Sequence, residues 1–255
     1  MVDEIIAEDD PRIEAGYKTL RGYWDAIGPS DSDVITYLVN PQFMGAPAWP
    51  NMRQAYRVVR PAGSLIIASE GLSDPFVGTD ATDQQGFGCE LYIETPDLAG
   101  ANFDALRGSW AFVLIEAVAQ NAADRGGMSD LIDRYGVLSM ELSLGDTFPH
   151  EWKTPAGAVG CLINAPVAGR PPRVDGMPFG RVDIYCVKLL TPQQTAAIGA
   201  GGPDARDIVV KHLSRTPGSH ISSLKPSTSG AQTPEPSGGF GHWVSGILGK
   251  ITGKS

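Results

Sequence analysis

Three pairs of carboxylates are the side chains of this sequence whose type and spacing could support chemistry. They are Glu70 with Asp74, Asp80 with Asp83, and Glu90 with Glu94. Two neighbouring carboxylates can act as general acid and general base, but each role needs a positioned partner group. The sequence places no such partner beside any of the three pairs. We therefore predict that none of them is catalytic.

Two glycines, Gly86 and Gly88, begin a dinucleotide-binding pattern in the stretch GFGCELYIETP (86–96). The third glycine of GxGxxG is missing because position 91 is Leu91, and strand-forming residues follow where a helix should begin. The ending TGKS (252–255) imitates a phosphate loop but lacks the first glycine and the helix of that motif. We therefore predict no nucleotide and no other cofactor.

Motifs for a nucleophilic serine or a metal are incomplete as well. No serine stands in a GxSxG elbow, and PHEWK (149–153) has a His-Glu pair without the second His of HExxH. We predict no metal site and no enzyme. The alternative is a hydrolase with an unrecognised site, for which Glu70, Asp74 and His150 are the most concrete set.

A polar strand face is the more concrete candidate for binding. In residues 89–95, CELYIET, side chains alternate between the two faces of a strand, which groups Glu90, Tyr92 and Glu94 on one face. We expect a half-exposed strand whose acidic face could receive a basic partner. The predicted partner-binding residues are Glu70, Ser73, Asp74, Glu90, Tyr92 and Glu94.

The elements that must position these residues are short strands and a few helices. Apolar residues at helical spacing predict helices over 10–24, 102–125 and 192–215, with a short one after Ser129. β-Branched and aromatic runs predict strands over 34–39, 55–60, 64–69, 89–95, 137–144, 158–167 and 181–190. Strands and helices do not alternate strictly. We therefore predict an α+β fold with a mixed or antiparallel sheet flanked by helices.

Charge limits the class of partner. The chain carries −9, and residues from Arg206 onward carry six bases against two acids, so residues 1–205 carry −13. Nucleic-acid binding needs clustered Lys and Arg, which this acidic body lacks. We predict a protein partner of basic character and no nucleic acid.

Cysteines and the N-terminus predict the compartment. Cys89, Cys161 and Cys186 lie in apolar runs without CxxC spacing, which favours buried, reduced thiols. The start, MVDEIIAEDD, has five acids and no base, so it is unlike a secretory leader. We predict a cytoplasmic protein.

Composition divides the chain into three parts. Residues 1–215 are predicted to form the globular domain, and residues 216–240, rich in Pro, Gly, Ser and Thr, a flexible linker. Residues 241–255 carry apolar side chains at helical spacing between three glycines. This segment is either a frayed end or an amphipathic segment that contacts a membrane or secretion complex.

A resemblance to a known family rests on two blocks around the opening stretch. The matching residues are Gly71, Leu72 and Ser73, then Gly86, Phe87, Gly88, Glu90 and Leu91, with Trp110 on a later helix. This pattern resembles the signature of the Suppressor of fused domain family, over roughly residues 30–200. Animal members carry a His- and aromatic-rich run where this chain has SLIIASE (64–70). They also have a second domain that clamps a transcription-factor peptide, for which this chain lacks the length.

Compact bacterial members resemble this chain better, and they are regarded as immunity proteins of polymorphic toxin systems or as binding modules without enzymatic activity. The resemblance therefore implies a non-catalytic protein-binding module. Its most concrete form is a bacterial immunity protein that neutralises a basic toxin domain.

Overall fold

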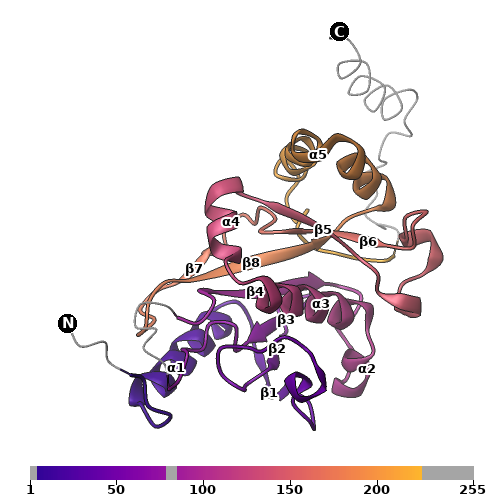
Figure 1. The fold of residues 1–255 in the computed structure, drawn as a ribbon. Helices are drawn as coiled ribbons and strands as arrows, with labels where there is room; N and C mark the ends of the chain where they lie inside the picture. The colour runs from indigo at the N-terminus through magenta and orange to yellow at the C-terminus, as the bar shows by residue number, and fades with distance from the viewer. Residues whose placement is uncertain (1–4, 79–84, 226–255) are drawn as a thin grey trace, which may run out of the picture.

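The chain is described by a computed structural model over residues 5–78 and 85–225. In these residues the strands form one eight-stranded sheet in the order β1-β2-β3-β4-β8-β6-β5, with β7 paired to β8 (Figure 1). The strands are β1 Ser30–Ile35, β2 Ala55–Val59, β3 Leu65–Glu70, β4 Cys89–Thr95, β5 Leu138–Leu142, β6 Val159–Ile163, β7 Arg173–Val174 and β8 Val182–Leu189.

The long strand β8 joins two halves of this sheet. Its first part runs parallel to β4, with Asp183 opposite Cys89 and Cys186 opposite Tyr92. Its last part pairs antiparallel with β6, with Leu189 opposite Cys161. All other pairings are antiparallel, so the sheet is mixed as predicted. The pairing between β4 and β8 ends at Tyr92 and Cys186.

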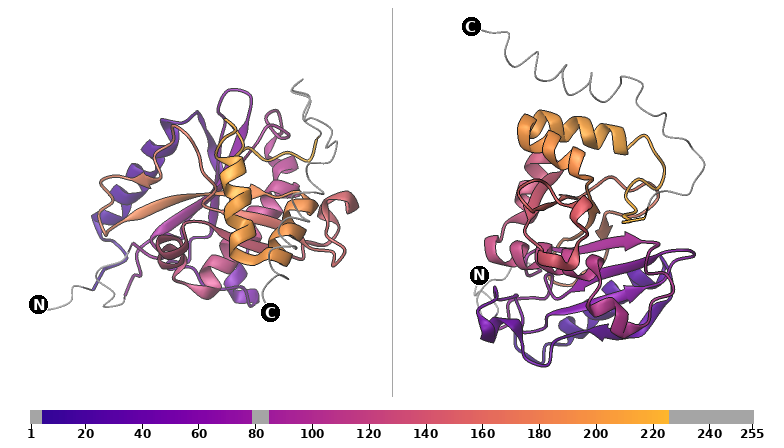
Figure 2. Two further views of the ribbon diagram at one scale, coloured as in Figure 1. Left: turned by 90° about the horizontal axis from the view of Figure 1, so that it is seen from above. Right: turned by 90° about the vertical axis from the view of Figure 1, so that its right-hand side faces the viewer.

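Helices cover both faces of the sheet, and the first and last helices, α1 and α5, cover different halves of it (Figure 2). The helices are α1 Pro11–Asp25, α2 Phe103–Arg107, α3 Trp110–Arg125, α4 Met128–Tyr135 and α5 Pro192–Leu213, with 3-10 turns at Pro41–Met44, Gly145–Thr147 and His150–Trp152. Side chains of α2, α3 and α4 share one hydrophobic cluster with Cys89, Leu91 and Ile93. Side chains of α1 and α5 share the opposite cluster with Tyr92.

Local signals place most helix ends. Asp10 caps α1, and Thr191 with Gln194 forms a capping box at α5. The single helix predicted over 102–125 is wrong, because Gly108 ends α2 and Ser109 caps a new helix, α3. The strand predicted over 34–39 lies earlier, at Ser30–Ile35, and the short strand β7 was not predicted.

The predicted linker boundary needs correction. Residues 216–225 lie against the sheet, and the side chain of Ser222 is fully buried. The Ser222 amide donates to the Glu94 carbonyl oxygen at 2.8 Å, and the Ser222 hydroxyl accepts from the Leu189 amide at 3.0 Å. Ser222 thus bridges β4 and β8 where these strands part. The ordered body extends to at least 225, and the segment predicted over 241–255 lies outside the described residues.

Candidate functional site

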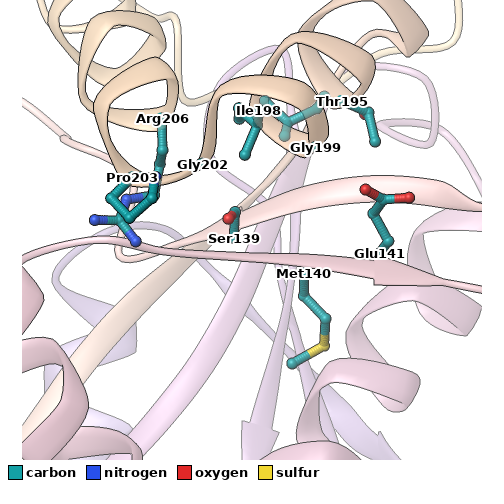
Figure 3. A pocket seen from close by; sticks show the side chains of 10 residues that line it. Ser139, Met140, Glu141, Thr195, Ile198, Gly199, Gly202, Pro203 and Arg206 are labelled. Carbon is teal, nitrogen blue, oxygen red and sulfur yellow. The ribbon is translucent and has the colours of Figure 1, made fainter. Parts of the chain in front are cut away.

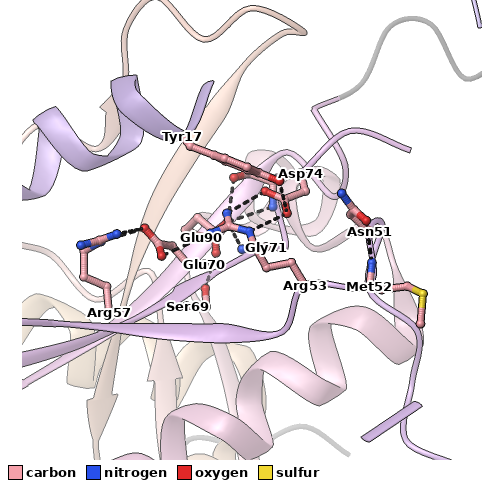
Figure 4. A network of polar contacts seen from close by, with 11 residues as sticks. Tyr17, Asn51, Met52, Arg53, Arg57, Ser69, Glu70, Gly71, Asp74 and Glu90 are labelled. Atoms are coloured by element: carbon pink, nitrogen blue, oxygen red, sulfur yellow. Dashed lines mark hydrogen bonds and ion pairs between the residues drawn. The ribbon is translucent and has the colours of Figure 1, made fainter. Parts of the chain in front are cut away.

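Glu90 is the centre of a buried polar network (Figure 4). Its side chain is fully buried and accepts hydrogen bonds from the Ser73 hydroxyl at 2.7 Å, the Ser73 amide at 2.9 Å, the Gly71 amide at 3.0 Å and the Ser69 hydroxyl at 2.5 Å. Burial raises the pKa of Glu90 to about 7, although these hydrogen bonds act in the opposite direction. The carboxylate thus fixes the turn between β3 and the Gly86 loop.

Two arginines continue the network. Arg57 donates to the Glu70 carboxylate at 2.7 Å, and Arg53 reaches the same carboxylate at 3.3 Å. Arg53 also holds Asp74 with two hydrogen bonds of 2.9 Å and lies 4.0 Å from the ring centroid of Tyr17. Each of these carboxylates therefore has a guanidinium partner, as buried charges require.

The network clamps the loop between β1 and β2. A Cβ atom on Gly71 would lie 2.1 Å from the Arg53 carbonyl oxygen, and one on Gly86 would lie 2.2 Å from the Asp74 carbonyl oxygen and 2.8 Å from Pro50. Both glycines have positive φ angles, 133° and 51°. Trp49 is buried beside Gly71. The signature residues thus hold residues 49–53 at close range, which only glycine permits.

The clamped loop presents apolar side chains to solvent. Eight large hydrophobic residues of the described chain are exposed, and five of them lie here: Leu38, Val39, Phe43, Met44 and Met52. The Asn40 side chain donates to the Met52 carbonyl oxygen at 2.5 Å and caps the turn Pro41–Met44, so the two ends of this group adjoin. We call residues 38–52 the apolar loop. Contiguous exposed apolar groups of this kind mark interaction surfaces.

A second cluster surrounds Glu94. Its carboxylate accepts from the Ser64 hydroxyl at 2.7 Å and from Arg170 at 2.8 Å, and it lies 3.2 Å from Nε2 of His220. Burial would raise the pKa of Glu94, but His220, Ser64 and Arg170 together lower it to about 2. His220 comes from the segment 216–225, so this cluster ties the C-terminal end of the body to β4.

The polar face of β4 is buried, which contradicts the half-exposed strand that we expected. Glu90 is 0% exposed, Tyr92 1% and Glu94 5%. Glu70, Ser73 and Asp74 are buried too. Tyr92 lies beneath Trp24 of α1, edge-on at 5.6 Å between ring centroids. None of the six predicted residues forms an open acidic surface, and their part in partner binding stays a prediction.

The structure brings Glu70 and Asp74 together through Arg53, but it does not add His150 to them. His150 is exposed in a 3-10 turn, and no hydrogen bond or ion pair in the described chain joins it to either carboxylate. No group of His, Cys, Asp or Glu within residues 5–78 and 85–225 could hold a metal ion. No described helix is long and apolar enough to cross a membrane.

The cysteines are buried and free, as predicted. Burial raises the pKa of all three thiols, to about 12 for Cys161 and Cys186. Since the thiolate is the reactive form, these side chains are packing groups.

Several clefts of the described residues are large enough for small ligands. One of about 350 Å³ lies between β5 and α5, with Glu141 and Arg206 at its ends and Ser139 between them (Figure 3). Another, of about 370 Å³, lies beside Tyr92 and Arg170. Neither was predicted from the sequence, because each is formed by segments that are distant in the chain. For part of the apolar loop a local signal existed: Phe43 and Met44 stand in a Pro- and Gly-rich run without strand or helix periodicity.

The fold is similar to that of Drosophila Suppressor of Fused in its crystal structure, with a TM-score of 0.51 and 14% sequence identity. The match covers 98% of this chain and 56% of the Drosophila chain, so this chain spans a little over half the length of that protein. No family model matches the sequence, and no curated protein matches it either. The likeness establishes a Suppressor of fused-like α+β fold.

Proposed function

We propose that this chain, with its Suppressor of fused-like fold, is a non-catalytic protein-binding module that contacts its partner through the apolar loop. The observation that carries this proposal is the position of the exposed apolar side chains. Five of the eight in the described residues gather on one loop, whose end at 49–53 is held to the sheet by Gly71, Gly86 and the Arg53–Asp74 pair and is tied to Asn40 through Met52. A surface that is rigid before binding loses little entropy on association.

The buried polar residues support the same proposal, because their hydrogen bonds are made within the chain. Glu70 and Asp74 are held by arginines, and Glu90 is held by four donors from the turn at 69–73. These hydrogen bonds hold the backbone of the turn and of the neighbouring loop in place. We infer that Glu70, Ser73, Asp74 and Glu90 influence a partner through the loop that they position, and not by touching it.

We further propose that the partner is a basic protein domain and that the module is a bacterial, cytoplasmic immunity protein that neutralises a toxin. The charge of −13 on residues 1–205 would steer a basic domain toward this body. The exposed side chains of the apolar loop would fill an apolar pocket on that domain. We expect a 1:1 interface of roughly 1,200–2,000 Å² in total.

The test is affinity capture of partners from the native host with the full chain and with Phe43→Ser/Met44→Ser. The matched control is Leu131→Ser/Tyr135→Ser, which removes two exposed apolar side chains of α4. We expect one stoichiometric basic protein with the native chain and the control, and a loss of at least tenfold in its recovery with the loop variant. Equal recovery with both variants would refute the role of the loop.

The immunity role needs a separate readout. The captured protein is expressed in a sensitive host with and without this chain, and growth is followed. Rescue by the native chain and the α4 control, but not by the loop variant, is the expected result. A captured partner that is harmless when expressed alone would exclude immunity while leaving protein binding intact.

A further inference from the structure

Arg170 has an unusual environment. Its Nη2 atom donates to Glu94 at 2.8 Å, and its guanidinium carbon lies 4.9 Å from the ring centroid of Tyr92. Its Nη1 atom is buried and has no hydrogen-bond partner. Five buried side-chain polar atoms of the described chain lack a partner, and Arg170 Nη1 is the charged one among them. Such a donor costs free energy until an oxygen acceptor reaches it.

The same arginine lines the cleft of about 370 Å³. Most of the other lining side chains are apolar: Val137, Ala165, Pro166, Val167, Pro172 and Ile184. A cavity of this size with apolar walls and few polar groups has the form of a small-molecule site. Arg170 is its one charged lining residue. The site therefore combines an apolar body with a single cationic end.

Hydrogen bonds hold segments that line the cleft in place. Asn164 has a φ angle of 65° and is the one non-glycine residue with positive φ in the described chain. Its side chain donates to the Gly136 carbonyl oxygen at 2.8 Å, and both residues line the cleft. The Tyr23 hydroxyl donates at 2.7 Å to the carbonyl oxygen of Pro171, which also lines the cleft. Strained backbone held in this way gathers at ligand sites.

From these observations we propose that the cleft binds a small monocarboxylate with an apolar body, whose carboxylate accepts a hydrogen bond from Arg170. Glu94 already accepts from Nη2, so the ligand carboxylate would be the acceptor for the buried Nη1 atom, which requires the Arg170 side chain to shift toward the cleft. The planar guanidinium is suited to a carboxylate. The apolar walls favour an aliphatic or aromatic body over a polar one. The cleft is separate from the apolar loop, so this site and the partner surface can succeed or fail independently.

The probe is octanoate, titrated into the full-length chain and followed by amide and methyl chemical shifts. Octan-1-ol, which has the same body without the charge, and acetate, which has the charge without the body, are the matched probes. We expect saturable shifts at Val137, Ala165 and Ile184 with octanoate, and binding at least tenfold weaker with both other probes.

Two substitutions at the site should move the affinity in opposite directions. Arg170→Gln removes the cation and should weaken octanoate binding tenfold or more, without changing the response to octan-1-ol. Glu94→Gln frees the guanidinium from its internal acceptor and should strengthen octanoate binding severalfold. Arg206→Gln, in the cleft between β5 and α5, is the control arginine and should change nothing.

Each outcome decides for or against the site. If Arg170→Gln fails to fold, the Glu94→Gln result still tests the proposal, because a site that used only apolar contacts would not tighten. Equal affinity for octanoate and octan-1-ol, or octanoate binding that neither substitution alters, would overturn it. So would the absence of saturable shifts around the cleft in the native chain.

Discussion

Strand β4 carries two carboxylates on one face, Glu90 and Glu94, four residues apart and both buried. Among the described residues, hydroxyl and amide groups bond Glu90, and burial raises its pKa to about 7. Glu94 has a guanidinium and an imidazole beside it, and its pKa falls to about 2. The two pKa values therefore shift in opposite directions, because Glu90 is the more deeply buried and has neutral donors, whereas Glu94 has His220, Ser64 and Arg170 beside it.

The comparison also shows how the fold distributes its cations. The nearby arginines bond other carboxylates: Arg53 donates to Asp74, and Arg57 donates to Glu70. The donors to Glu90 in the described residues are uncharged hydroxyl and amide groups. The two carboxylates therefore give opposite pH dependence to stability: Glu90 favours the folded state when it is protonated, and Glu94 when it is ionised.

The largest expected effect is on the Glu90 side, at Gly71. In Gly71→Ala the new methyl group would overlap the Arg53 carbonyl oxygen and would sit on a backbone with φ of 133°. We expect the free energy of unfolding to fall by about 3 kcal/mol or more, measured in urea. Gly63→Ala is the control, since Gly63 has φ of 81° and open space around it, and it should cost about 1 kcal/mol. Equal losses would mean that the close approach does not constrain this turn.

The next effect is the pH dependence due to Glu90. Its pKa is raised from the ordinary 4.5 to about 7, so its contribution to stability is complete below pH 4.5 and is lost as the pH rises toward 7. We expect this loss to reach up to about 3 kcal/mol. In Glu90→Gln this part of the pH profile should be absent, as measured by urea unfolding from pH 4.5 to 8. A profile that the substitution leaves unchanged would show that Glu90 is ionised throughout.

Glu94 should produce the opposite and smaller effect. Its pKa is lowered, so its contribution is present above pH 4.5 and is lost as the pH falls toward 2. Because the cluster lies near the surface, solvent screening reduces the expected loss to about 1–2 kcal/mol. Thermal unfolding between pH 2.5 and 5 should show a flatter profile for Glu94→Gln than for the native chain. Glu90→Gln should keep the native profile at acid pH. If both variants flatten that profile, the two carboxylates do not differ in the direction of their pH dependence.

The smallest effect is expected where the C-terminal segment bridges β4 and β8. Ser222→Ala removes the acceptor of the Leu189 amide and should cost about 1 kcal/mol. Hydrogen exchange at Leu189 should become faster in the variant. Ser223→Ala, which removes a bond to Asp97 at the surface, should leave that exchange unchanged. Unaltered protection of Leu189 in Ser222→Ala would show that the bridge is not needed there.

Local sequence signals were reliable where the deciding contacts are local. The helix from residue 10, the helix from residue 192 and the alternation of residues 89–95 could all be read locally, and each element formed where it was predicted. The break between α2 and α3 was missed because the apolar periodicity continues across Gly108. The parallel pairing of β4 with β8 joins residues that are about 90 positions apart, and no local pattern encodes it.

The candidate site divides in the same way. The glycines of the signature could be read from the sequence as architecture, whereas its acids were predicted to bind a partner and are buried instead. The hydrogen-bond partners of these acids could not be read, because Arg53, Arg170 and His220 come from a loop and from the C-terminal end of the body. The exposure of Leu38 and Phe43 also depends on what the fold leaves uncovered.

By itself the sequence determined the type of most elements, the acidic character of the body and the glycines that the Glu90 turn requires, because these follow from backbone sterics, side-chain period and charge. Only the tertiary structure decided that the polar face of β4 is buried. A strand shows which residues share a face, but whether that face meets water depends on distant segments. Here α1, the segment that carries Arg170 and residues 216–225 cover it, whereas the large apolar side chains of the apolar loop stay exposed.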